Sequence, residues 1–86
     1  MKLEELWNNI LKNEGNTFYT KTKLPFTYEK INNDSIKIYR GSDSVGNVTK
    51  DSIRFIMDNP DLSRHEYRDV MRTSSYALAL YKFLNQ

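Results

Sequence analysis

Apolar residues in the first segment of the chain repeat with the period of an α-helix. They fall at i, i+3, i+4, i+7 and i+8, which places them on one stripe of a helix: Leu3, Leu6, Trp7, Ile10 and Leu11. Gly15 follows this stripe, and glycine commonly ends a helix because it can adopt the left-handed conformation. The pattern predicts a helix over about residues 2–14.

The next segment has the composition of β-strands. Three short stretches, at about residues 17–22, 25–31 and 35–40, are rich in the Thr, Tyr, Phe and Ile that pleated strands favour. Between the second and third stretches, Asn32-Asn33-Asp34 is typical of a tight turn. We therefore expect three antiparallel strands, with a hairpin joining the last two.

The length of that turn decides which side chains face the core. A two-residue loop would mix polar and apolar residues on each face of the hairpin. A three-residue loop pairs Tyr28 with Ile38 and Glu29 with Lys37, and this register separates the two faces. We therefore expect these side chains to point to the core: Phe18, Phe26, Tyr28, Ile36 and Ile38.

Helix-capping residues predict two helices in the second half of the chain. The segment GSDSVGN has the composition of a loop, and Thr49, which follows it, is a favourable N-cap for a helix over about residues 50–58. Ser63 and Glu66 then form a capping box for a last helix, whose apolar face continues nearly to the C-terminus.

These elements predict an α+β fold with the order α-β-β-β-α-α. It would be a two-layer sandwich, in which a three-stranded antiparallel sheet packs on the helices. Serine and threonine at positions 73–75 compete for backbone hydrogen bonds, so we expect a break in the last helix near Ser74. The 86 residues give room for a single domain, residues 1–86, and its small core leaves homodimerisation open.

Composition points to a reducing compartment. The chain has no cysteine, which excludes disulfides and thiolate metal sites. Its longest apolar stretch, Ala77–Tyr81, is far shorter than the roughly 20 residues that a membrane-spanning helix needs. The first segment carries acids and asparagines where a secretion signal needs an apolar run. We therefore expect a cytoplasmic protein that has no membrane partner.

Residues suited to catalysis or metal binding are sparse. The only imidazole, His65, lies at the second position of a capped helix, where we expect a solvent-exposed side chain. The segment Gly41–Gly46 lacks the Lys-Ser/Thr pair that completes a phosphate-binding loop. The sequence therefore predicts no enzyme active site, no metal site and no cofactor.

Positive charge is concentrated in the strand region. The net charge of the chain is +2, whereas residues 17–41 alone carry +3. The outer face of the predicted sheet presents basic and aromatic side chains: Tyr19, Lys21, Lys23, Lys37 and Tyr39. Lysine attracts phosphates and tyrosine stacks on bases, as in proteins that bind single strands. An ordinary solvated sheet face carries the same residue types, so both interpretations stay open.

A row of arginines provides a second basic surface. Arg64, Arg68 and Arg72 recur at i, i+4 and i+8, which places them along one side of the predicted last helix. Guanidinium groups bind phosphates and carboxylates bidentately, so the row could face nucleic acid or an acidic protein surface. The alternative is that the arginines pair internally with Asp61 or Asp69.

Two resemblances accompany these patterns. The order of a helix, a three-stranded meander and a C-terminal helix is similar to the double-stranded-RNA-binding domain. SRHEYRDVM has no match to that family's basic run at the start of its last helix, so no functional residue is carried over. More locally, LPFTYEKINNDSIKIYR and RTSSYALALYKFL resemble small uncharacterised bacterial and phage-borne domains that pair a Phe-x-Tyr strand with an Arg-x-x-Ser-Tyr helix.

The sequence thus predicts a small accessory module that binds DNA or RNA through the sheet face and the arginine row. Binding would rest on phosphate attraction and stacking, without base-specific readout. The alternative is a protein-interaction module, such as a phage- or mobile-element-encoded inhibitor, whose arginines contact an acidic partner.

Overall fold

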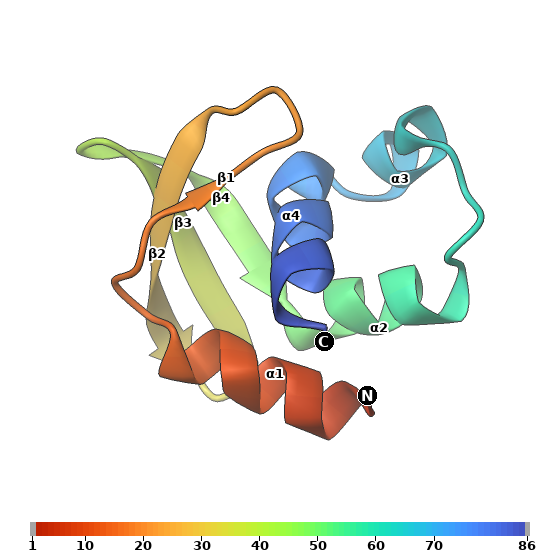
Figure 1. Ribbon diagram of the computed structural model, residues 1–86, viewed down its shortest axis with the longest axis horizontal. Helices are drawn as coiled ribbons and strands as arrows, with labels where there is room; N and C mark the ends of the chain where they lie inside the picture. The colour runs from red at the N-terminus through yellow and green to blue at the C-terminus, as the bar shows by residue number, and fades with distance from the viewer. Residues whose placement is uncertain (1, 86) are drawn as a thin grey trace.

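The structure is a computed structural model that describes residues 2–85, apart from the side chains of Arg64 and Val70. Over this range the order of elements is α1 (Leu3–Lys12), β1 (Phe18–Tyr19), β2 (Pro25–Asn32), β3 (Ser35–Arg40), β4 (Asp43–Thr49), α2 (Lys50–Asp58), α3 (Arg64–Val70) and α4 (Ser74–Leu84). The strands form an antiparallel sheet in the order β1-β2-β3-β4, and the helices pack on one face of it (Figure 1). The predicted α+β class is confirmed.

The prediction of three strands is wrong, because the segment interpreted as a loop contains β4. Arg40 pairs with Asp43, so Gly41 and Ser42 form a two-residue hairpin turn, with Gly41 at a φ of +63°. Such turns require positive φ, which glycine adopts without steric cost. The observed order is therefore α-β-β-β-β-α-α-α, because the last predicted helix is also divided into α3 and α4.

The predicted register of the hairpin formed by β2 and β3 is confirmed. Tyr28 pairs with Ile38 and Glu29 pairs with Lys37. The register shifts by one residue between Lys30 and Asn32, which leaves a two-residue turn in place of the three-residue loop. The indole N–H of Trp7 donates to the carbonyl of Asn33 in this turn at 2.7 Å. Helix α1 thereby fixes the end of the hairpin.

The core lies between the helices and the inner face of the sheet. The fully buried large side chains come from α1, β2, β3, β4, α2 and α4: Leu6, Trp7, Ile10, Phe26, Tyr28, Ile36, Ile38, Val48, Ile53, Ile56 and Leu80. Burial of each large apolar side chain contributes about 1.5–3 kcal/mol, offset by the entropy of ordering the chain. The one strongly polar group in this set, the Tyr28 hydroxyl, donates to the carbonyl of Ile10 at 2.6 Å.

Both predicted N-caps are confirmed. The Thr49 hydroxyl accepts from the amide of Ser52 at 3.1 Å, and the Ser63 hydroxyl accepts from the amide of Glu66 at 3.2 Å. These bonds satisfy N–H groups that have no partner within the helix. Along residues 2–85 no helix combines the length and the apolar character that a membrane span requires.

The expected break in the last helix lies slightly earlier than Ser74. Helix α3 ends at Val70, and Met71 has an extended backbone with φ −145° and ψ 135°. Helix α4 then begins at Ser74 with Thr73 as its N-cap residue. Arg68 and Arg72 therefore do not share one helix, so the prediction that they form a helical row with Arg64 is wrong. The side chain of Arg64 lies outside the described residues.

Candidate functional site

The outer face of the sheet holds a self-contained polar cluster. The Tyr39 hydroxyl donates to a carboxylate oxygen of Glu29 at 2.7 Å, and this bond, together with partial burial, raises the pKa of Tyr39. The Lys37 ammonium lies 5.9 Å from the centroid of the Tyr39 ring, and Lys37 pairs with Glu29 across the strands. The Tyr39 hydroxyl is therefore engaged within the sheet, and Lys37 lies beside the Tyr39 ring and across the strands from Glu29.

A groove with an apolar floor runs along α4, next to β1 and the β1–β2 loop. Leu78 and Ala79 lie on the α4 side of it, and Tyr19 and Phe83 line it with side chains that are 50% and 46% exposed. Its basic residues are Lys21, Lys23 and Lys82, and its volume is about 490 Å³. We call this feature the α4 groove.

The β1–β2 loop is held in place by Thr20, which is buried. The Thr20 hydroxyl accepts from the amide of Leu24 at 3.1 Å, and the Thr20 carbonyl accepts from the amide of Lys23 at 2.8 Å. Lys23 itself has a φ of +66°, the only positive φ of a non-glycine residue in the described chain. This conformation costs a lysine roughly 1 kcal/mol, so the loop holds Lys23 against a local preference.

A second hollow lies where α3 meets α4. It has a volume of about 280 Å³ and is lined by His65, Arg68, Arg72, Ser74 and Ser75. Ser75 also lines the α4 groove, so the two hollows meet at the first turn of α4. We call the second hollow the junction hollow.

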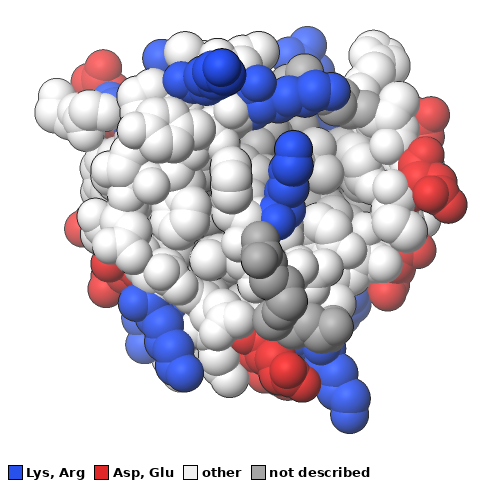
Figure 2. All heavy atoms as spheres, viewed as in Figure 1, with Lys and Arg blue, Asp and Glu red and all other residues white. Residues whose placement is uncertain are grey.

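The two hollows together concentrate the positive charge of the molecule. Among the residues that the structure describes, they are lined by five Lys and Arg residues and by no carboxylate. The eight other Lys and Arg residues of the chain are outnumbered by its eleven Asp and Glu residues. In Figure 2, several Lys and Arg side chains gather along the upper edge, over the β1–β2 loop and the α3–α4 junction, while others lie at the lower left and lower right; acidic side chains lie at the upper left, at both flanks and at the bottom. Charge and cavity therefore coincide on one side of the molecule.

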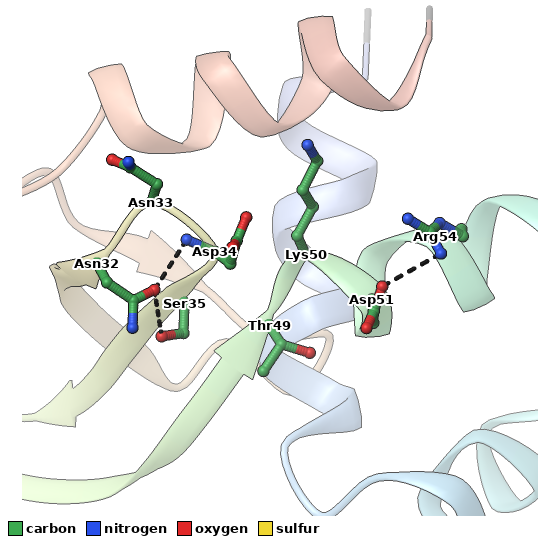
Figure 3. Close-up of a pocket in the computed structure, with 8 residues that line it drawn as sticks. All are labelled: Asn32, Asn33, Asp34, Ser35, Thr49, Lys50, Asp51 and Arg54. Carbon is green, nitrogen blue, oxygen red and sulfur yellow. Dashed lines mark hydrogen bonds and ion pairs between the residues drawn. The ribbon is translucent and has the colours of Figure 1, made fainter.

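A third hollow, at the start of α2, differs from these two because it is lined by charged residues of both signs. It has a volume of about 620 Å³, and Figure 3 shows its lining of turn residues and of the first turns of α2. Arg54 pairs with Asp51 at 3.3 Å, and Lys50 pairs with Glu4 of α1. The Asn32 side chain accepts hydrogen bonds from the Asp34 amide and the Ser35 hydroxyl. Because its charges are paired internally, this hollow has no excess of either sign, although it is larger.

The structure divides the predicted site residues between two surfaces. Tyr19, Lys21 and Lys23 line the α4 groove, and Arg68 and Arg72 line the adjoining junction hollow. Lys37 and Tyr39 lie apart, in strand positions that alternate with the buried Ile36 and Ile38 and so point away from the helices. The basic residues predicted on the sheet face and the predicted arginines therefore come together only in part.

Several residues that line the α4 groove were not predicted as site residues from the sequence, among them Lys82 and Phe83. A signal was present, because Phe83 is a large apolar residue near the end of a helix whose other face already supplies the core. An aromatic side chain in that position, beside a lysine, is typical of a contact surface.

Comparisons of the chain with family models, with curated proteins and with solved structures gave no match. The features of this chain that bear on its function are therefore the geometry and charge of the two hollows.

Proposed function

We propose that this protein binds nucleic acid, DNA or RNA, through the α4 groove and the junction hollow. The observation that carries the proposal is the lining of these joined hollows by five cations and two exposed aromatic rings, with no carboxylate among the described lining residues. Lys21, Lys23, Lys82, Arg68 and Arg72 take part in no ion pair within the described residues. They are therefore available to an external anion.

Binding would combine two physical terms. The cations neutralise backbone phosphates and release counterions, which gives affinity without sequence preference. Tyr19 and Phe83 offer ring faces on which bases stack, worth about 1–3 kcal/mol per base in proteins that bind single strands. A base can enter the apolar α4 groove only when it is unstacked from a duplex, so the geometry favours single strands.

The proposed contact surface differs from the surface that was predicted from the sequence. Lys37 and Tyr39 are excluded from it, because they line neither hollow and lie on the outer face of the sheet, where the Tyr39 hydroxyl donates to Glu29. Lys82 and Phe83 replace them. The protein would act in the cytoplasm as an accessory module, without catalysing a reaction.

The proposal is tested by titrating the protein into a fluorescent oligothymidylate and following anisotropy at several salt concentrations. Binding is expected at about 50 mM salt, and five phosphate contacts to a single strand give a slope of log K against log salt of about −3.5. Absence of binding at this salt concentration would refute the proposal.

A matched pair of charge reversals locates the surface. Lys82→Glu places an acid in the α4 groove and is expected to lower affinity at least about 10-fold. Lys37→Glu makes the same change in charge on the outer sheet face and is expected to lower affinity far less. Equal losses in the two variants would mean that only the net charge matters and that the groove is not the contact surface.

The alternative function is a protein-interaction module that binds an acidic surface, as an inhibitor would. The apolar floor of the α4 groove favours it, because protein interfaces commonly combine an apolar centre with a charged rim. A pull-down with the immobilised chain would distinguish the two. One stoichiometric protein partner that survives nuclease treatment, lost with Lys82→Glu, would favour the alternative.

A further inference from the structure

The first turn of α4 has polar groups without partners in the described part of the chain. The Thr73 hydroxyl, which in most helices would cap this turn, donates to the carbonyl of Asn47 at 2.7 Å, and no side chain caps α4. The amides of Tyr76 and Ala77 donate to the Thr73 carbonyl. The amides of Ser74 and Ser75, which come first, have no acceptor within a helix and carry the positive end of its dipole.

A serine side chain without a partner lies at the same place. Ser74 is only 6% exposed, lines the junction hollow, and its side chain makes no hydrogen bond within residues 2–85. The Ser74 oxygen is not sealed from solvent, so it is free to donate to an anion that enters the hollow. The hydroxyl therefore adds a side-chain donor to the junction hollow, beside the amides of the helix terminus.

Cationic groups surround this hydroxyl. Arg68 reaches the junction hollow from α3 and Arg72 from the segment that joins α3 to α4, and neither forms an ion pair with a described carboxylate. His65 completes the lining, while the nearest acid to it, Asp69 at 3.7 Å, does not line the hollow. The volume of about 280 Å³ lies just below the roughly 300–1,000 Å³ of clefts for drug-sized ligands, so it suits one compact anion.

The number of donors exceeds what an internal phosphate can use. A phosphodiester has one negative charge and two free oxygens, whereas a terminal phosphate carries about −1.5 to −2 charges and three acceptor oxygens. Two guanidinium groups, each able to bind bidentately, match the terminal group better, and the Ser74 hydroxyl and two amides add further donors.

We propose that the junction hollow binds the terminal phosphate of a nucleic acid strand, while the adjoining nucleotides lie in the α4 groove. The inference rests on the proposed function and gives it an end-specific ligand. Ser75, which lines both hollows, marks the point where the terminal phosphate would connect to the first sugar and base. The shared chemistry is a phosphomonoester, at either the 5′ or the 3′ end.

The test compares three unlabelled oligothymidylates of equal length by titration calorimetry: one with a 5′-phosphate, one with a 3′-phosphate and one with hydroxyls at both ends. One phosphorylated end is expected to bind at least about 10-fold more tightly than the hydroxyl form, from the added charge-assisted hydrogen bonds. Arg72→Gln should abolish this preference. Lys82→Gln, the matched control in the α4 groove, should weaken all three oligonucleotides by a similar factor.

Inorganic phosphate provides a second measurement on the unaltered protein. Its addition should shift the NMR signals of the Ser74 and Ser75 amides and leave that of Lys37 unchanged. If all three oligonucleotides bind equally and phosphate shifts neither serine amide, the end-specific inference is overturned while the proposed function stands. If none of the three binds, both fail together.

Discussion

Thr73 and Gly46 are in contact across the fold, one at the start of α4 and the other within β4. A Cβ on Gly46 would lie 2.8 Å from the Thr73 methyl group, closer than two carbon atoms can approach. The Thr73 hydroxyl donates to the neighbouring Asn47 carbonyl at 2.7 Å. Strand β4 thus determines where the chain breaks between α3 and α4, and with it the positions of Arg72 and Ser74.

Gly46→Ala is expected to lower the free energy of unfolding by about 2–3 kcal/mol, because it adds both the steric overlap and an unfavourable φ of +140°. Urea denaturation followed by the fluorescence of the single tryptophan, Trp7, would measure this. Thr73→Ser keeps the hydroxyl and removes the methyl group, so in the double variant the steric part should be recovered. Strictly additive effects of the two substitutions would show that the contact is not formed.

Lys23 should show a trade-off between stability and binding. Lys23→Gly relieves the φ of +66° and is expected to leave stability unchanged or raise it by up to about 1 kcal/mol, while oligonucleotide affinity falls through the loss of one phosphate contact. Lys23→Asn, which tolerates the same conformation, controls for chain flexibility and should weaken binding equally. Unchanged affinity in both variants would remove Lys23 from the α4 groove contacts. Anisotropy and thermal unfolding are the two measurements.

The aromatic rings of the α4 groove should contribute through stacking. Tyr19→Ala and Phe83→Ala are each expected to weaken binding to oligothymidylate by about 1–3 kcal/mol, and to leave binding to an abasic strand of equal length nearly unchanged. The abasic strand keeps the phosphates and lacks the bases. A loss of equal size for both strands would indicate that the substitutions distort the groove instead. Tyr39→Ala, on the outer sheet face, serves as the matched control.

The buried Tyr28 hydroxyl should make stability depend on pH in the alkaline range. Burial, and to a lesser degree the charge of Glu14, raise the pKa of Tyr28 in the folded state well above the value of about 10 in an unfolded chain. The stabilisation is therefore fully present below about pH 10 and is lost as the pH rises toward the folded-state pKa.

Tyr28→Phe tests this assignment. At neutral pH it is expected to cost about 1 kcal/mol, because the bond to the Ile10 carbonyl is lost. The variant has no hydroxyl to ionise in the unfolded chain, so its deficit relative to the natural protein should shrink above pH 10. A deficit that stays constant up to pH 11 would contradict the buried, protonated state. Urea denaturation at matched pH values gives both curves.

Local patterns predicted the elements whose causes are local. The stripe through Leu6 and Ile10 defined α1, and the caps at Thr49 and Ser63 defined the starts of α2 and α3. Strand β4 was missed because Gly46 interrupts its alternation and only two of its residues are apolar. The Gly41-Ser42 pair was a usable signal for a hairpin turn that the composition of the surrounding loop concealed.

The types of residue in the candidate site could be predicted from the sequence, whereas the way in which the fold brings them together could not. Lys21 and Arg68 were identified from their charge, whereas their convergence depends on the packing of α4 against β1 and on the break at Thr73. Both are tertiary effects that periodicity does not encode. The neutral cluster around Tyr39 was partly foreseeable, because the predicted register already placed Glu29 opposite Lys37.

The bond between Trp7 and the turn at Asn33 also bears on how the chain acquires its structure during translation. Helix α1 leaves the ribosome first, yet its apolar stripe is covered by a hairpin made later and by α2 and α4, which emerge last. A nascent chain must therefore keep Leu6, Trp7 and Ile10 exposed until residues as far as Leu80 are available. Folding of this domain is therefore expected to begin only after Leu80 has left the ribosome, with chaperones competing for its first helix in the interval.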